Sequence, residues 1–294
     1  MLEKDQFENW IKASHTLFEI FEGRYDAYPL ARKWVQEWLS FKEFDIKKDD
    51  LTVINNFTED FDYDVFRNFR DTFERNDDNW RTLKNTIINQ FGRLVENNFK
   101  VGRHGNVGLA VAPYLFTWNF QRFKEYFKAK NIDLEFYFKQ LGVFLESKTS
   151  TFEFFKEKRL VSDQIDHGEA KKLFEQINAK LKELGKGHNE PVGTAKLLHI
   201  FAPYYFPLID NSEAQAVGLV EYGESITSNL YLKWMVKLKE WLQKYHEQIE
   251  KLEREHNSSI IKLVDEGLYI MSTVKQKARV AELGLWVSQN AFVF

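Results

Sequence analysis

The chain of 294 residues contains no cysteine. This absence excludes disulfide frameworks, cysteine-ligated zinc, iron–sulfur clusters and thiol nucleophiles. It is typical of proteins in a reducing compartment, and we expect a cytoplasmic protein. The chain also has no phosphate-binding loop, nucleophile elbow or zinc-protease motif. The acidic stretch DQIDHGE at 163–169 holds a single histidine, which is more typical of a solvated loop than of a metal site, so we predict no metal and no cofactor.

The net charge of the chain is small, and long apolar runs are few. The chain has 41 basic and 44 acidic residues, a net charge of −3, which argues against a protein whose whole surface binds nucleic acid but leaves room for a local basic patch. The N-terminal residues MLEKDQFENW lack the apolar core of a signal peptide, and no apolar run reaches the roughly 18 residues of a membrane span. We therefore expect no membrane partner.

Apolar and aromatic residues are abundant and recur at helical spacing. They make up 44% and 16% of the chain, enough for the core of one large or two ordinary domains. Phe7, Trp10, Ile11 and Phe18 mark a first helix, and similar stripes follow along most of the chain. Such stripes are more typical of a packed core than of a ligand site. We predict a mainly α, multi-helix globular protein.

The predicted organisation is an N-terminal helical region at 1–101 and a helical domain at 102–294. The first region contains an acidic, turn-rich segment at 43–64, which would repel a phosphate backbone. The second begins with GRHGNVG at 102–108, which we interpret as an inter-helix loop or as an anion-binding nest with Arg103 and His104 as donors. Candidate strands are few and lie at 51–57 and at the C-terminus.

Periodicity predicts further helices in the second region. They are expected at about 132–147, 151–160, 168–184, 229–256 and 260–281, with Ser258 or Ser259 capping the last. Trp118 lies among polar residues, a pattern that suits either a cleft wall that stacks on a base or a helix contact.

Residues 170–220 contain the most informative pattern of the chain. A helix ending at Leu184 is followed by GKGHNEPVG and by a second helix that we expect to begin near Gly193. The backbone N–H groups of such a hairpin can bind a phosphate, and Val192, Gly193, Thr194 and Lys186 are the candidate contacts. Residues 180–200 hold four lysines against two glutamates, so this patch is locally positive.

Downstream, FPLIDNSEAQAVGL places Asp210 directly after an apolar segment. With Pro191 to Lys196 and Pro207 to Asp210, the sequence resembles the helix–hairpin–helix DNA glycosylase superfamily over about residues 170–220. The resemblance implies DNA as partner and a base-excision activity that breaks an N-glycosidic bond, with Asp210 stabilising charge on the sugar or orienting a water, and Lys196 as an amine nucleophile. Lysine falls one position later than in the bifunctional enzymes, where this chain has Ala195.

Each of these residues also has a structural interpretation. Asp210 and Glu213 match a capping box, and Lys196 fits a solvated position on an amphipathic helix. Tyr204 and Tyr205 can stack on a base or pack in the core, and His199 is more typical of a satisfied core histidine. Three functions therefore stay open, namely a DNA glycosylase, a non-catalytic nucleic-acid-binding module, and a helical protein-interaction scaffold.

Overall fold

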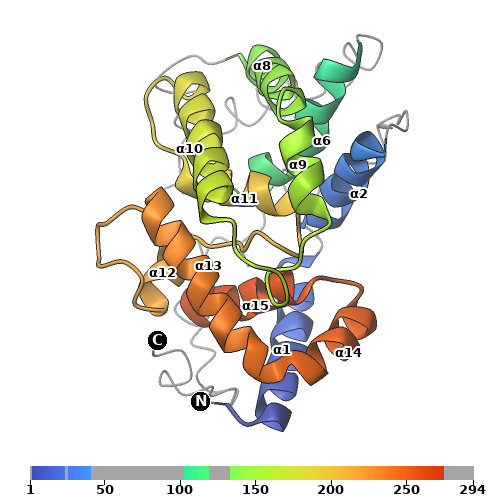
Figure 1. The fold of residues 1–294 in the computed structure, drawn as a ribbon, viewed down its shortest axis with the longest axis vertical. Helices are drawn as coiled ribbons and strands as arrows, with labels where there is room; N and C mark the ends of the chain where they lie inside the picture. The colour runs from blue at the N-terminus through green and yellow to red at the C-terminus, as the bar shows by residue number, and fades with distance from the viewer. Residues whose placement is uncertain (1, 24–25, 41–101, 119–132, 275–294) are drawn as a thin grey trace, which may run out of the picture. The chain divides into compact units, whose positions relative to one another are not determined.

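The computed structural model describes residues 2–23, 26–40, 102–118 and 133–274 (Figure 1). These residues form helices joined by turns and contain no β-strand, which confirms the mainly α prediction. The acidic segment at 43–64, the candidate strands and the C-terminal part of the helix expected at 260–281 lie outside the described residues. None of the described helices combines the length and the hydropathy that a bilayer-spanning segment needs.

The chain folds into two compact units, each discontinuous in sequence. The first comprises Met1–Gly23, Phe154–Asn178 and Thr194–Phe294, and the second comprises Arg24–Glu153 and Ala179–Gly193. Three helices have residues in both units: α9 (Thr149–Lys156), α10 (His167–Leu184) and α11 (Pro191–Phe201). The predicted boundary at residue 101 adjoins the undescribed segment 41–101 and stays a prediction.

In the second unit, α6 (Gly102–Trp118) packs on α2 (Tyr28–Leu39) and α8 (Leu134–Glu146). The prediction that GRHGNVG forms a loop or an anion-binding nest is wrong, because this stretch is the first two turns of α6. Arg103 and His104 therefore lie in a helix. Gly108 serves packing instead: a Cβ there would lie 2.0 Å from the Phe138 carbonyl oxygen of α8, so only glycine lets the two helices approach this closely.

In the first unit, α1 (Lys4–Phe21) packs on α14 (His246–His256) and α15 (Ile260–Tyr269). The Phe7 ring stacks on Tyr245 at 4.1 Å between centroids and meets Trp241 edge to face at 5.4 Å. All three rings are buried, which confirms that the aromatic stripe of the first helix is core.

The single helix predicted at 229–256 is wrong in its continuity. The chain forms α13 (Ser228–Leu242), a 3-10 turn at Gln243–Tyr245, and then α14. Trp241 of α13 and Tyr245 of the 3-10 turn both contact Phe7, and the Tyr245 hydroxyl donates to the Leu2 carbonyl oxygen at 2.9 Å. The predicted cap of the last helix is confirmed, because the Ser259 side chain accepts a hydrogen bond from the Lys262 N–H.

Candidate functional site

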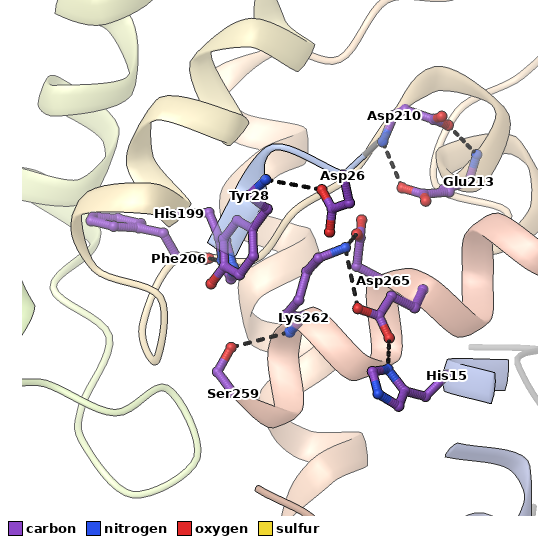
Figure 2. A network of polar contacts seen from close by, with 11 residues as sticks. His15, Asp26, Tyr28, His199, Phe206, Asp210, Glu213, Ser259, Lys262 and Asp265 are labelled. Atoms are coloured by element: carbon purple, nitrogen blue, oxygen red, sulfur yellow. Dashed lines mark hydrogen bonds and ion pairs between the residues drawn. The ribbon is translucent and has the colours of Figure 1, made fainter. Parts of the chain in front are cut away.

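Asp210 is the N-cap of the short helix α12 (Asn211–Ala216). Its carboxylate accepts the Glu213 N–H at 2.7 Å, and the Glu213 carboxyl accepts the Asp210 N–H at 2.7 Å (Figure 2). This reciprocal pair is the capping box that the sequence predicts. The cap uses one oxygen, Oδ1, and the side chain stays partly exposed, so a second role for the same carboxylate is compatible with the geometry.

The segment before Asp210 is held by α13. The Tyr231 hydroxyl donates to the Pro207 carbonyl oxygen at 2.8 Å, and the Trp234 indole N–H donates to the Leu208 carbonyl oxygen at 3.1 Å. Both donors are buried and belong to a rigid helix, so they determine where the extended segment ends and where the Asp210 carboxylate lies. In the sequence these two residues are indistinguishable from other members of an apolar stripe, which is why their role was not predicted.

Lys196 lies on α11 in the first unit and is partly exposed. Burial lowers the pKa of its amine to about 8, although the nearby carboxylates favour the charged form, Asp210 most strongly. Lys196 and Asp210, 14 positions apart in the sequence, therefore share one electrostatic environment. At neutral pH, a larger fraction of this amine is therefore unprotonated than of an ordinary lysine.

Two further carboxyl groups complete this environment. Glu213 is only 2% exposed, and burial raises its pKa well above the ordinary value, with Asp210 and Asp265 adding to the shift. Burial also raises the pKa of Asp265 to about 6, with Lys262 opposing the shift. Burial therefore raises the pKa values of both Glu213 and Asp265, the two acids nearest in charge interaction to this pair.

A buried ion cluster on α15 adjoins these groups. The Lys262 amine lies 3.4 Å from both Asp265 and Glu266, and 4.3 Å from the centroid of the Phe18 ring of α1. The Glu266 carboxylate in turn contacts His15 Nδ1 at 2.7 Å. Figure 2 shows Lys262, Asp265 and His15 in this arrangement. We did not predict this cluster, although a lysine followed by acids three and four positions later in the apolar run IIKLVDE is a signal that the sequence contains.

The His15 contact predicts a pH dependence of stability. The Glu266 hydrogen bond raises the pKa of His15 above 6.5, whereas burial and His15 itself lower the pKa of His256, whose ring meets His15 at 4.5 Å. The raised pKa means that the His15 contribution is complete below about pH 6.5 and is lost as the pH rises through the folded-state pKa.

In a His256→Gln background, the further change His15→Gln is expected to cost about 1 kcal/mol more near pH 6 than near pH 9. The background removes the second histidine, whose titration has the opposite sign. Urea unfolding at the two values measures the difference. An equal cost at both would show that the charge of His15 does not stabilise the fold.

The residues of the predicted hairpin lie in and just after the turn between α10 and α11. The second helix begins at Pro191, two residues before the predicted start, because proline suits the first helical position. Lys186 is exposed with φ +50°, and the Gly187 N–H, at φ +106°, donates to the Lys182 carbonyl oxygen at 2.8 Å. Val192 is partly exposed and Gly193 is buried. Thr194 is fully buried, and its predicted backbone contact with a phosphate stays a prediction.

The predicted stacking residues separate into three groups. Tyr205 is fully buried and stacks on Phe155 at 5.0 Å, so the expectation that its ring stacks on a base is wrong. Tyr204 is partly exposed, with the Arg159 guanidinium 4.8 Å from its ring centroid. Trp118 is the last residue of α6, and the surroundings of its side chain lie outside the description. His199 is buried, with Nδ1 2.7 Å from the Phe206 carbonyl oxygen, a satisfied core histidine as predicted.

The acids of the stretch 163–169 make local backbone contacts. Asp163 accepts the Arg159 N–H at 2.6 Å, and Asp166 accepts the Glu169 N–H at 3.1 Å. In the described part of the chain, no group of three or more histidines and acids is arranged to hold a metal ion.

The chain matches no protein-family model, and no curated protein and no solved structure is similar enough to it to count as a match.

Proposed function

We propose that the protein is a DNA glycosylase of the base-excision type, in which Lys196 is the amine nucleophile and Asp210 the assisting carboxylate. The observation that carries the proposal is the state of Lys196, a partly exposed lysine whose pKa burial lowers to about 8 and which shares its surroundings with Asp210. A lysine becomes a useful nucleophile at neutral pH when desolvation depresses its pKa in this way.

The position of the lysine also supports this choice. Ala195 stands where the bifunctional enzymes have lysine, and it is fully buried. The next residue points about 100° further round the helix. In this chain the shifted lysine is partly exposed, and Asp210 is the carboxylate that most strongly favours the charged form of its amine.

In the proposed reaction, Lys196 displaces the base and becomes attached to the sugar. The unprotonated Lys196 nitrogen attacks C1′ of a flipped-out nucleotide, and the electrons of the N-glycosidic bond leave with the base, which takes up a proton. Asp210 stabilises the positive charge that develops on the sugar. The attached nitrogen then loses a proton. The C1′–O4′ bond breaks as the C1′=N bond forms, and O4′ takes up the proton, so that a protonated Schiff base joins Lys196 to the opened deoxyribose.

Borohydride trapping tests the proposal directly. The wild type is incubated with duplex and single-stranded oligonucleotides carrying a panel of damaged bases or an abasic site, and both base release and the reduced covalent adduct are measured. We expect an adduct with the wild type and none with Lys196→Ala. Base release by Lys196→Ala should be at least about a hundredfold slower than by the wild type. Lys172→Ala, an exposed lysine of α10, is the matched control.

Asp210 needs a variant that keeps the helix cap. Asparagine caps a helix about as well as aspartate, so Asp210→Asn is expected to fold normally and yet to release bases at least about a hundredfold more slowly. An adduct that survives Lys196→Ala, or no activity of the wild type on any substrate, would overturn the proposal.

A second candidate is a nucleic-acid-binding module without catalysis. It is favoured by the capping box, which accounts for Asp210 without chemistry, and by the exposed Lys186 at the hairpin turn. This function predicts salt-dependent binding that Lys186→Ala weakens, with no base release. If the protein binds no polynucleotide at low salt, the helical interaction scaffold is the remaining function.

A further inference from the structure

Two cation–aromatic pairs lie side by side after α9 in the first unit. The Lys158 amine lies 3.8 Å from the centroid of the Phe154 ring, and the Arg159 guanidinium lies 4.8 Å from that of Tyr204. The two cations are consecutive in the sequence, while the rings come from α9 and from the segment after α11. Neither the helical periodicity nor the hairpin pattern predicts this juxtaposition.

The pairs combine accessible rings with a rigid base. Phe154 is 47% exposed, and Tyr204 is partly exposed. Beneath them the buried rings of Phe155 and Tyr205 stack on each other. The Leu160 N–H donates to the Tyr204 carbonyl oxygen at 2.8 Å, which joins the two segments. The exposed rings are therefore presented in a preorganised way, which lowers the entropy cost of binding.

The charge of the pairs is only partly neutralised. Arg159 forms an ion pair with Glu253, but the described contacts of Lys158 are with the rings of Phe154, Phe155 and Tyr205. A cation over an aromatic face keeps its full positive charge for an anion that approaches from solvent. An exposed ring and such a cation, a few ångströms apart, match the planar base and the anionic phosphate of one nucleotide.

We propose that Phe154, Lys158, Arg159 and Tyr204 form a stacking surface for single-stranded nucleic acid. A base stacks on Phe154 or Tyr204, and the phosphates on either side contact Lys158 and Arg159. Single strands fit this surface because only unpaired bases expose their faces for stacking. The inference rests on the proposed function, which gives nucleic acid as the ligand. It adds that the protein binds the single-stranded form.

Fluorescence anisotropy with a labelled oligothymidine of about 20 nucleotides, and with a duplex of the same length, tests the surface over a salt series. Phe154→Ala is expected to weaken single-strand binding about 5- to 150-fold, the range found for one stacked base. Lys158→Ala should reduce the slope of log K against log salt by about 0.7, the value for one phosphate contact on a single strand.

The controls separate stacking from general effects. Phe136 of α8 is 60% exposed, so Phe136→Ala removes an exposed ring elsewhere and should leave binding unchanged. Phe154→Tyr should retain binding, which excludes a folding defect as the cause of the alanine result. Failure of the wild type to bind oligothymidine at low salt, or equal losses in Phe154→Ala and Phe136→Ala, would overturn the inference. Because the assay measures binding, it can succeed even if no base is ever released.

Discussion

Replacing Gly108 by alanine is expected to destabilise the second unit by about 4 kcal/mol or more. The added Cβ would lie 2.0 Å from the carbonyl oxygen and 2.9 Å from the carbonyl carbon of Phe138, and 3.1 Å from the Gly142 nitrogen. These are backbone atoms of α8, so no side-chain rotation relieves the overlap and the two helices must move apart. The separation would expose the buried residues on both sides of their contact. Urea unfolding followed by circular dichroism measures the loss.

Gly168 is the matched control for this change. It also lies in a helix, α10, but a Cβ there meets only an Asp166 oxygen at the ordinary distance of 3.8 Å. Gly168→Ala is therefore expected to change the free energy of unfolding by no more than about 1 kcal/mol, in the stabilising direction, because alanine favours the helix. If Gly108→Ala were as well tolerated as Gly168→Ala, the close approach of α6 and α8 would be wrong.

Lys262→Met is expected to cost about 3–5 kcal/mol near pH 7.5, the usual result of removing one partner from a buried ion pair. Lys262 and Glu266 are each 3% exposed, and the amine lies 3.4 Å from both Asp265 and Glu266. Methionine has a similar length but no charge, so it leaves two carboxylates of like charge close together, with Glu266 buried and Asp265 partly exposed. Their mutual repulsion and lost solvation are the source of the expected cost.

The pH dependence of this cost distinguishes charge from packing. Burial already raises the pKa of Asp265 to about 6 in the wild type, so its carboxyl binds more protons in the folded state than in the unfolded state, and its ionisation destabilises the fold as the pH rises from about 4 to above 6. Without Lys262, which opposes this shift, the pKa of Asp265 rises further, and its ionisation destabilises the fold more strongly. Acidification to about pH 5 should therefore narrow the difference between Lys262→Met and the wild type.

A neutralised variant provides the control. Lys262→Met combined with Asp265→Asn and Glu266→Gln removes the stranded charges and should recover at least about half of the lost stability. A loss that is the same at both pH values, and that the neutralised variant does not recover, would show that Lys262 contributes by packing alone.

The sequence by itself determined the features that depend on near neighbours along the chain. The Asp210 capping box, the Ser259 cap and the core positions of Phe7 and Trp10 follow from side chains that act within one or two turns. For the same reason the mainly α class was predictable: helical hydrogen bonds join residues four apart, and the apolar stripes repeat with the helical period.

Only the tertiary structure decided the features that depend on contacts with residues far away in the sequence. GRHGNVG has the composition of a loop, but the backbone of α8 approaches Gly108 so closely that a glycine-bearing helix is the form that packs. The apolar stripe runs through 243–245 without a break, whereas the structure has a 3-10 turn there, whose Tyr245 contacts Phe7 and Leu2 at the far end of the chain. The lowered pKa of Lys196 likewise results from burial, opposed by Asp210 and by Asp265 of α15, because desolvation and Coulomb interactions act through space rather than along the sequence.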